Sequence, residues 1–157
     1  MQSCYINTPL GLAKITGDRD GIASVSIVDY NEDVSEVVPE ALKQCAQQLK
    51  AYFKNELEHF DLKLNPEGSL FQKKVWTHLQ NIPFGKTISY LELSKQLGDV
   101  KAIRAVANAN AKNPIWIIVP CHRVIGSDGS LTGYAGGLGR KQWLLNHEHL
   151  NKQQSLF

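Results

Sequence analysis

Apolar and polar residues alternate in the first part of the chain, and this pattern predicts strands. The alternation runs through residues 11–16 and again through 23–28. Between them, Asp-Arg-Asp-Gly at 18–21 ends in Asp-Gly, a dipeptide typical of tight turns. The two segments are therefore expected to form a hairpin.

A helix is predicted after this hairpin. Pro39 suits a first helical turn, and an apolar stripe follows at helical spacing. The stripe consists of Leu42, Cys45, Leu49, Tyr52 and Phe53. This places Cys45 on the buried face, where a cysteine behaves as a small, inert hydrophobic residue.

Pro-Glu-Gly at 66–68 then marks a boundary, which predicts an α/β domain over residues 1–66 and a second domain over 67–157.

The second part reads as short helices. Ser69 with Gln72, and Ser89 with Glu92, are capping-box signatures that predict two helix starts. The helix after Ser89 should stop at Gly98, and another should run over 101–112 and end before Asn-Pro at 113–114. Two short helices around a glycine turn are compatible with a helix-turn-helix, although many helical hairpins bind nothing.

The predicted helix over 101–112 carries unusually small side chains. Residues 102–111 include five alanines and a single cation, Arg104. One interpretation is tight packing against a neighbouring helix. The other is a helix that enters a narrow nucleic-acid groove with Arg104 as its long side chain.

Composition narrows the class of protein. With 157 residues and 43% hydrophobic content, the chain suits one or two small domains. The longest apolar run, 115–119, is far too short to span a membrane, and no secretory signal is visible. An odd number of cysteines, three, argues for a reducing compartment. A cytoplasmic protein without membrane contact is the expectation.

The net charge of +2 conceals an uneven distribution. Residues 1–66 carry six Lys/Arg and ten Asp/Glu, a balance of −4, whereas residues 67–157 carry eleven and five, a balance of +6. If the protein binds a polyanion, the second part is expected to meet it. A solvated basic face explains the charge equally well.

The candidate chemistry lies after the apolar run 115–119, which we interpret as a buried strand leading to Cys121 and His122. A thiolate is the attacking form of cysteine, and a nearby base promotes its formation. Neighbouring residues on a strand point to opposite faces, however, so the pair alone leaves the role of Cys121 open. No Cys-x-x-Cys pair is present, which disfavours zinc. No metal or cofactor is expected.

An ordered series of motifs carries a family resemblance. Val-Pro-Cys-His-Arg-Val at 119–124 resembles the active-site signature of the O6-alkylguanine-DNA alkyltransferases, the methylated-DNA–protein-cysteine methyltransferases. Further segments match that family in order and spacing: Phe-Gly-x-x-Ile-Ser-Tyr at 84–90, Ala-Val at 105–106, Asn-Pro at 113–114, Tyr-x-Gly-Gly at 134–137 and Lys-x-Trp-Leu-Leu-x-x-Glu at 141–148. The resemblance is dense over 69–149 and thinner before it.

The resemblance implies both a fold and an activity. The fold class is α/β (α+β): a ribonuclease-H-like N-terminal domain, then a helical, winged-helix-like DNA-binding domain with a helix-turn-helix. The implied activity is repair of double-stranded DNA, approached through the minor groove, by transfer of the alkyl group of a flipped-out O6-alkylguanine to Cys121. Each molecule reacts once. O4-alkylthymine is a further candidate lesion. The protein is expected to act as a monomer, with clustering along DNA left open.

The same resemblance implies roles for the reacting residues. Cys121 is the alkyl acceptor, and His122 takes its proton through a water. Glu148 orients the histidine, as in a hydrolase triad. Asn113 ties the recognition helix to the active-site segment, and Tyr90 donates to N3 of the guanine, where a donor stabilises the developing negative charge.

The resemblance also implies contacts with DNA. Arg104 fills the gap left in the base stack when the nucleotide flips out. The backbone near Cys121, Val124 and Ala135 reads the edge of the base. The remaining implied DNA-binding residues are Ala105, Tyr134 and Gly136. Many relatives have serine where this chain has Ala135, so only a hydroxyl is lost if the backbone N–H makes the contact.

Three other classes of function remain open at this point. A non-catalytic module that binds alkylated DNA would share the fold, but the presence of Cys121 disfavours it. A Cys-His hydrolase would turn over repeatedly, and a regulatory DNA binder would show no covalent change.

Overall fold

The computed structural model describes residues 1–154, which divide into two compact units. Unit 1 comprises residues 1–67 together with 114–116, and unit 2 comprises 68–113 and the chain from 117 onward. The short segment 114–116 therefore belongs with the first unit, although it follows most of the helices of the second.

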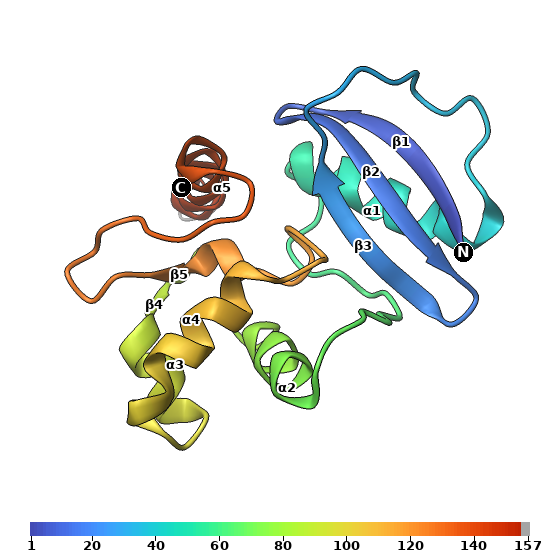
Figure 1. The fold of residues 1–157 in the computed structure, drawn as a ribbon. Helices are drawn as coiled ribbons and strands as arrows, with labels where there is room; N and C mark the ends of the chain where they lie inside the picture. Colours follow the sequence, from blue (N-terminus) through green and yellow to red (C-terminus); the bar gives the residue numbers. More distant parts are fainter. Residues whose placement is uncertain (155–157) are drawn as a thin grey trace. The chain divides into compact units, whose positions relative to one another are not determined.

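Unit 1 contains a three-stranded antiparallel sheet in the order β1 (Gln2–Thr8), β2 (Gly11–Asp18) and β3 (Gly21–Ile27) (Figure 1). The predicted hairpin is confirmed as β2 and β3, and β1 is an additional strand. Gly21 closes the hairpin with φ +134°, and a Cβ there would lie 2.9 Å from the Lys63 carbonyl oxygen. Only glycine suits this turn, because the conformation and the close approach both exclude a side chain.

One helix covers a face of this sheet (Figure 1). A short 3-10 turn, η1 (Glu40–Leu42), leads into α1 (Lys43–Phe53). The predicted stripe is confirmed at Leu42, Cys45, Leu49 and Tyr52, which are buried, while Phe53 is half-buried. Burial raises the pKa of Cys45 to about 12, so this thiol is inert.

Unit 2 is mainly helical. Its elements are α2 (Leu70–Leu79), β4 (Ile88–Ser89), α3 (Tyr90–Gln96), η2 (Val100–Ala102), α4 (Ile103–Ala111), η3 (Cys121–Arg123), β5 (Val124–Ile125) and α5 (Leu138–Gln154). Helices α2 and α4 pack together, and Trp76 Nε1 donates to the Ala109 carbonyl at 2.7 Å. The short strands β4 and β5 pair in parallel, which brings Val124 beside Ile88.

The predicted helix starts and stops of unit 2 are confirmed. Ser69 forms a complete capping box with Gln72, and the Ser89 hydroxyl accepts from the Glu92 N–H at 3.0 Å. Gly98, at φ +93°, makes the turn between α3 and the 3-10 start of α4. The pair α3–α4 is the predicted helix-turn-helix.

The predicted strand over residues 115–119 is wrong. Only Ile115 forms a β-bridge, with Val25, flanked by hydrogen bonds from Val25 N–H to Pro114 O (3.0 Å) and from Trp116 N–H to Val25 O (2.9 Å). The following residues turn, and Ile117 adopts φ +76°, which ends any strand. Four of the five side chains in this run are buried and Trp116 is half-buried, so the apolar run reflects burial and not pairing in a sheet.

The predicted fold class is confirmed, with a sheet-and-helix unit followed by a predominantly helical one. None of the helices that the structure describes is long and apolar enough to cross a membrane.

Candidate active site

Cys121 opens the 3-10 turn η3 and is almost completely buried, with 2% of its surface exposed. The Asn113 amide Nδ2 donates to the Cys121 sulfur at 3.2 Å and to the Val119 carbonyl at 2.9 Å. Asn110 Nδ2 donates to the Cys121 carbonyl at 3.3 Å. Asn110 in the last turn of α4 thus holds the backbone of the cysteine, and Asn113, just after the helix, holds its side chain.

The electrostatic surroundings of Cys121 keep the thiol protonated. Burial raises its pKa to about 11, and the Asn113 hydrogen bond and the nearby Lys141 charge offset this only in part. A thiol with this pKa carries almost no thiolate near neutrality. Nucleophilic attack by Cys121 therefore requires a base.

The adjacent His122 is paired with Glu148 of α5. His122 Nε2 lies 2.7 Å from Glu148 Oε2, and both side chains are buried. Burial lowers the pKa of His122, with Glu148 acting in the opposite direction. Burial alone would raise the pKa of Glu148, but the charges and hydrogen bonds of His122 and Arg123 hold it well below its usual range. The resting pair is a neutral imidazole on an ionised carboxylate.

A further buried lysine, Lys141, stands beside this cluster. Its Nζ donates to the Val124 carbonyl at 2.6 Å and to the Thr132 carbonyl at 2.7 Å. The Tyr90 hydroxyl donates to the same Thr132 carbonyl at 2.9 Å. Burial lowers the pKa of Lys141 to about 8, and burial also raises the pKa of Tyr90. Tyr90 is thus held as a neutral donor.

The loop before α5 contains the other residues predicted to touch the base. Tyr134 is buried and its carbonyl accepts from the Gly137 N–H at 3.0 Å. Gly136 is buried and its carbonyl accepts from Arg140 Nη1 at 3.3 Å, whereas Ala135 is exposed. These contacts fix the loop, with the backbone of Ala135 open to solvent.

Arg104 and Ala105 lie on the exposed face of α4. The opposite face is buried and includes Val106 and Ala109, so the small residues serve helix packing on one side. The structure thus brings together Cys121 with Asn113, and His122 with Glu148, and keeps Arg104 at the surface.

Three residues around the cysteine were not singled out from the sequence: Asn110, Arg123 and Lys141. Arg123 and Lys141 stand inside the quoted motifs, but a charged residue in a sequence gives no sign of burial. Over the described part of the chain, no group of three or more His, Cys, Asp or Glu residues is arranged to hold a metal ion.

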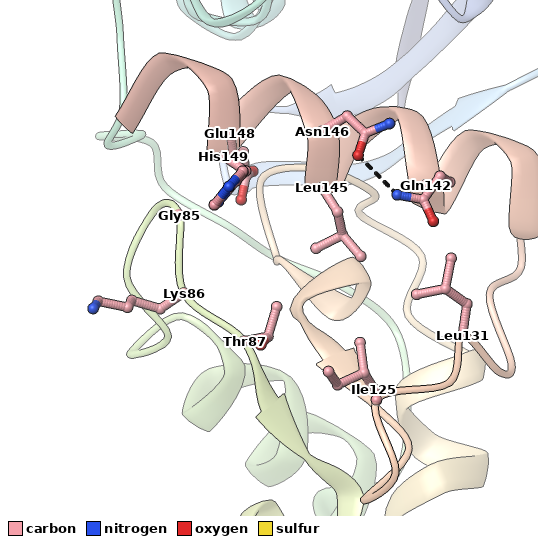
Figure 2. Close-up of a pocket in the computed structure, with 11 residues that line it drawn as sticks. Gly85, Lys86, Thr87, Ile125, Leu131, Gln142, Leu145, Asn146, Glu148 and His149 are labelled. Atoms are coloured by element: carbon pink, nitrogen blue, oxygen red, sulfur yellow. Dashed lines mark hydrogen bonds between the residues drawn. The ribbon is translucent and has the colours of Figure 1, made fainter. Parts of the chain in front are cut away.

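A pocket of about 350 Å³ lies against α5 on the side of Glu148 (Figure 2). Leu145 points from α5 toward Leu131 and Ile125, and Gln142 donates to Asn146 at 2.8 Å along the rim. Glu148 is among its lining residues and Cys121 is not. The pocket is therefore separate from the immediate surroundings of the thiol.

The fold and the site define a protein with a buried cysteine next in sequence to a histidine that pairs with a carboxylate, in a unit that contains a helix-turn-helix. Comparison with known proteins gives the family. Residues 1–66 match the ribonuclease-like domain of 6-O-methylguanine DNA methyltransferase, and residues 70–150 match its DNA binding domain. The chain belongs to this methyltransferase family.

Individual relatives agree with this assignment. The chain is 44% identical over 155 residues to a methylated-DNA–protein-cysteine methyltransferase of Methanosarcina acetivorans, covering 94% of this chain and 98% of the relative. It is similar to the crystal structure of Mycobacterium tuberculosis O6-methylguanine methyltransferase, with a TM-score of 0.85, 41% identity and coverage of 96% and 93%. Mycobacterium tuberculosis OGT in complex with DNA gives a TM-score of 0.84 at 42% identity, with coverage of 94% and 92%.

Proposed function

We propose that this protein repairs O6-alkylguanine in DNA by transferring the alkyl group to Cys121. The Cys121 sulfur attacks the alkyl carbon, the carbon–oxygen bond to the base breaks, and the electron pair remains on the guanine. His122 takes the thiol proton through a water, and Tyr90 donates to N3 of the base. The product is a thioether, which water cannot hydrolyse as it would an acyl group, so each molecule reacts once.

The observation that carries this proposal is the pairing of His122 with Glu148 at 2.7 Å, beside a buried, protonated Cys121. The test is intact-mass analysis after mixing the protein with an oligonucleotide that carries O6-methylguanine. We expect the protein to gain the mass of one methylene group, because methyl replaces the thiol hydrogen. An unchanged mass would rule out transfer and favour a non-catalytic module that binds alkylated DNA.

We propose that double-stranded DNA binds through its minor groove to the exposed face of α4. The support is a helix whose exposed side carries Ala105 beside one long cation, Arg104, in the basic part of the chain. Small side chains let such a helix approach a narrow groove.

We also propose that residues 67–157 act as the DNA-binding and alkyl-transfer domain. One monomer suffices for repair, and O4-alkylthymine is a second lesion to test.

We propose a cytoplasmic location with access to chromosomal DNA. The support is the proposed substrate together with three cysteines that are all free thiols, as is usual in a reducing compartment.

The pairing of Glu148 with His122 leads to a prediction. Glu148→Gln should slow alkyl transfer about tenfold or more, because the charge that supports a proton on His122 is lost. The variant should also raise the apparent pKa at which Cys121 reacts with a small alkylating reagent, measured as a pH–rate profile. DNA affinity should barely change. The exposed Glu67→Gln is the control, and an unchanged profile in Glu148→Gln would remove the relay from the mechanism.

The position of Tyr90 leads to another prediction. Tyr90→Phe should slow transfer from duplex DNA and from the free alkylated base to the same extent, about 30-fold, because the lost donor acts on the guanine itself. Single-turnover rates on both substrates measure this, with the exposed Tyr30→Phe as the control. A loss confined to the duplex substrate would instead assign Tyr90 to DNA binding.

A further inference from the structure

Arg123 is a buried cation whose side chain has no part in the steps described so far. It is 6% exposed, and its guanidinium donates two hydrogen bonds to the Glu148 carboxylate: Nε to Oε1 at 2.8 Å and Nη2 to Oε2 at 3.0 Å. The remaining nitrogen, Nη1, donates to the Ile82 carbonyl at 2.6 Å. This bidentate geometry is the strongest form of arginine–carboxylate contact, and a lysine cannot reproduce it.

The bidentate contact with Arg123 fixes the orientation of the Glu148 carboxylate. Oε1 accepts from Arg123, while Oε2 accepts from both Arg123 and His122. Arg123 is itself anchored on the backbone after α2, with the Phe84 ring 5.8 Å from its guanidinium. Turning the carboxylate out of the plane of the guanidinium would weaken these contacts, so they hold Glu148 with Oε2 facing the histidine.

This orientation decides which nitrogen of His122 carries the proton. An ionised carboxylate can only accept, so Nε2 must be the protonated nitrogen. The other nitrogen, Nδ1, is buried and has no hydrogen-bond partner among the described residues. Nδ1 thus keeps a free lone pair, as a base requires.

The charges around His122 oppose one another. Glu148 and Lys141 face it from α5, and Arg123 and Cys121 belong to its own turn. Tyr134, which also lies near Glu148, is neutral because burial raises its pKa. The Glu148 charge favours an imidazolium, whereas the Arg123 and Lys141 charges favour the neutral ring. Of the two cations, only Arg123 also contacts the carboxylate.

We propose that Arg123 is a positioning residue for alkyl transfer. It fixes the orientation of the Glu148 carboxylate and balances its negative charge, so that His122 rests as a neutral ring with Nδ1 free to accept the Cys121 proton. This inference rests on the proposed function, because it assumes that His122 is the base. The alternative is an ion pair that serves only to hold the fold, as many buried pairs do. The two differ in what happens to the pH dependence of the reaction.

The first experiment is a pH–rate profile of single-turnover methyl transfer for the wild type, Arg123→Met and Arg123→Lys. A neutral His122 is the active form, so the rate falls as the pH drops through the pKa of His122. Without the Arg123 charge, Glu148 raises that pKa, and the acidic limb should move to higher pH by about one unit or more. Arg123→Lys keeps a charge, so its limb should stay closer to the wild-type position. Arg19→Met, an exposed arginine of unit 1, is the control.

The second experiment measures the protonation of the His122 ring nitrogens directly and needs no DNA. Nitrogen NMR of the His122 ring in the wild type at neutral pH should show a protonated Nε2 and a bare Nδ1. An imidazolium or an Nδ1–H tautomer would overturn the inference, even if the Arg123 variants failed to fold. A wild-type protein that never accepts methyl from DNA would instead overturn the proposed function, so the two failures are distinguishable.

A double variant tests whether Arg123 acts through Glu148. In a Glu148→Gln background, Arg123→Met removes only the direct repulsion between the Arg123 charge and the imidazolium, so it should shift the acidic limb less than it does when Glu148 is present. An undiminished shift in the double variant would show that Arg123 does not act through Glu148. A uniform loss of rate in Arg123→Met, with the limb unmoved, would leave the residue a purely structural role.

Discussion

Cys121→Ser is expected to abolish methyl transfer completely while leaving DNA binding intact. A serine hydroxyl has a much higher pKa than a thiol, so it offers too little anion to displace the guanine, even with His122 beside it. DNA binding should persist, because phosphate contacts depend on the basic residues of the second part. The measurements are intact mass after incubation with O6-methylguanine DNA and a binding titration on the same duplex.

A matching prediction concerns the number of methyl groups that each wild-type protein molecule accepts. Transfer should plateau at about one methyl group per protein molecule, whatever the excess of damaged DNA, and the modified peptide should contain Cys121. Cys4→Ala and Cys45→Ala, which remove the other two thiols, should keep this plateau. Transfer beyond one equivalent would indicate a hydrolase-like turnover, and a methyl group on Cys45 would mean that the nucleophile is misassigned.

Arg104→Ala is expected to impair repair of duplex DNA on the order of 100-fold and to leave reaction with the free alkylated base unchanged. Extruding a base costs a few kcal/mol of stacking and pairing, and a side chain that fills the vacated space offsets part of that cost. The free base needs no extrusion. Single-turnover rates on the two substrates, compared as a ratio, isolate the effect on flipping.

The control for Arg104 is Lys112→Ala, which removes one positive charge from the other end of the same helix. It should weaken DNA binding and reduce its salt dependence without changing the ratio of the two rates. Equal losses on duplex and free base in Arg104→Ala would show that the residue supports the fold of unit 2 and not base extrusion.

The sequence predicted much of this structure because the decisive features are local. Ser69 and Ser89 mark helix starts through contacts three residues along the chain, and Asp-Gly at the start of β3 marks the hairpin. The pairing of His122 with Glu148 is different, since 26 positions separate the two residues. Only the ordered motifs of the family resemblance connected them before the structure brought their side chains together.

The features that sequence reasoning missed depend on tertiary context. The run 115–119 is apolar because it is buried, and a strand and a buried turn look alike in such a run. Arg123 and Lys141 would ordinarily be expected at the surface, because charged side chains are rarely buried unless paired. Their partners are carbonyl groups and a distant carboxylate, which no spacing in the sequence reveals.

The high pKa of the Cys121 thiol has a consequence for the lifetime of the protein. A molecule that reacts only once is wasted if its sulfur meets an oxidant or a stray electrophile first. Cellular oxidants attack thiolates that are accessible, and Cys121 at rest is neither ionised nor exposed. The same burial that obliges the protein to recruit a base therefore preserves its single equivalent of reactivity until a damaged nucleotide arrives.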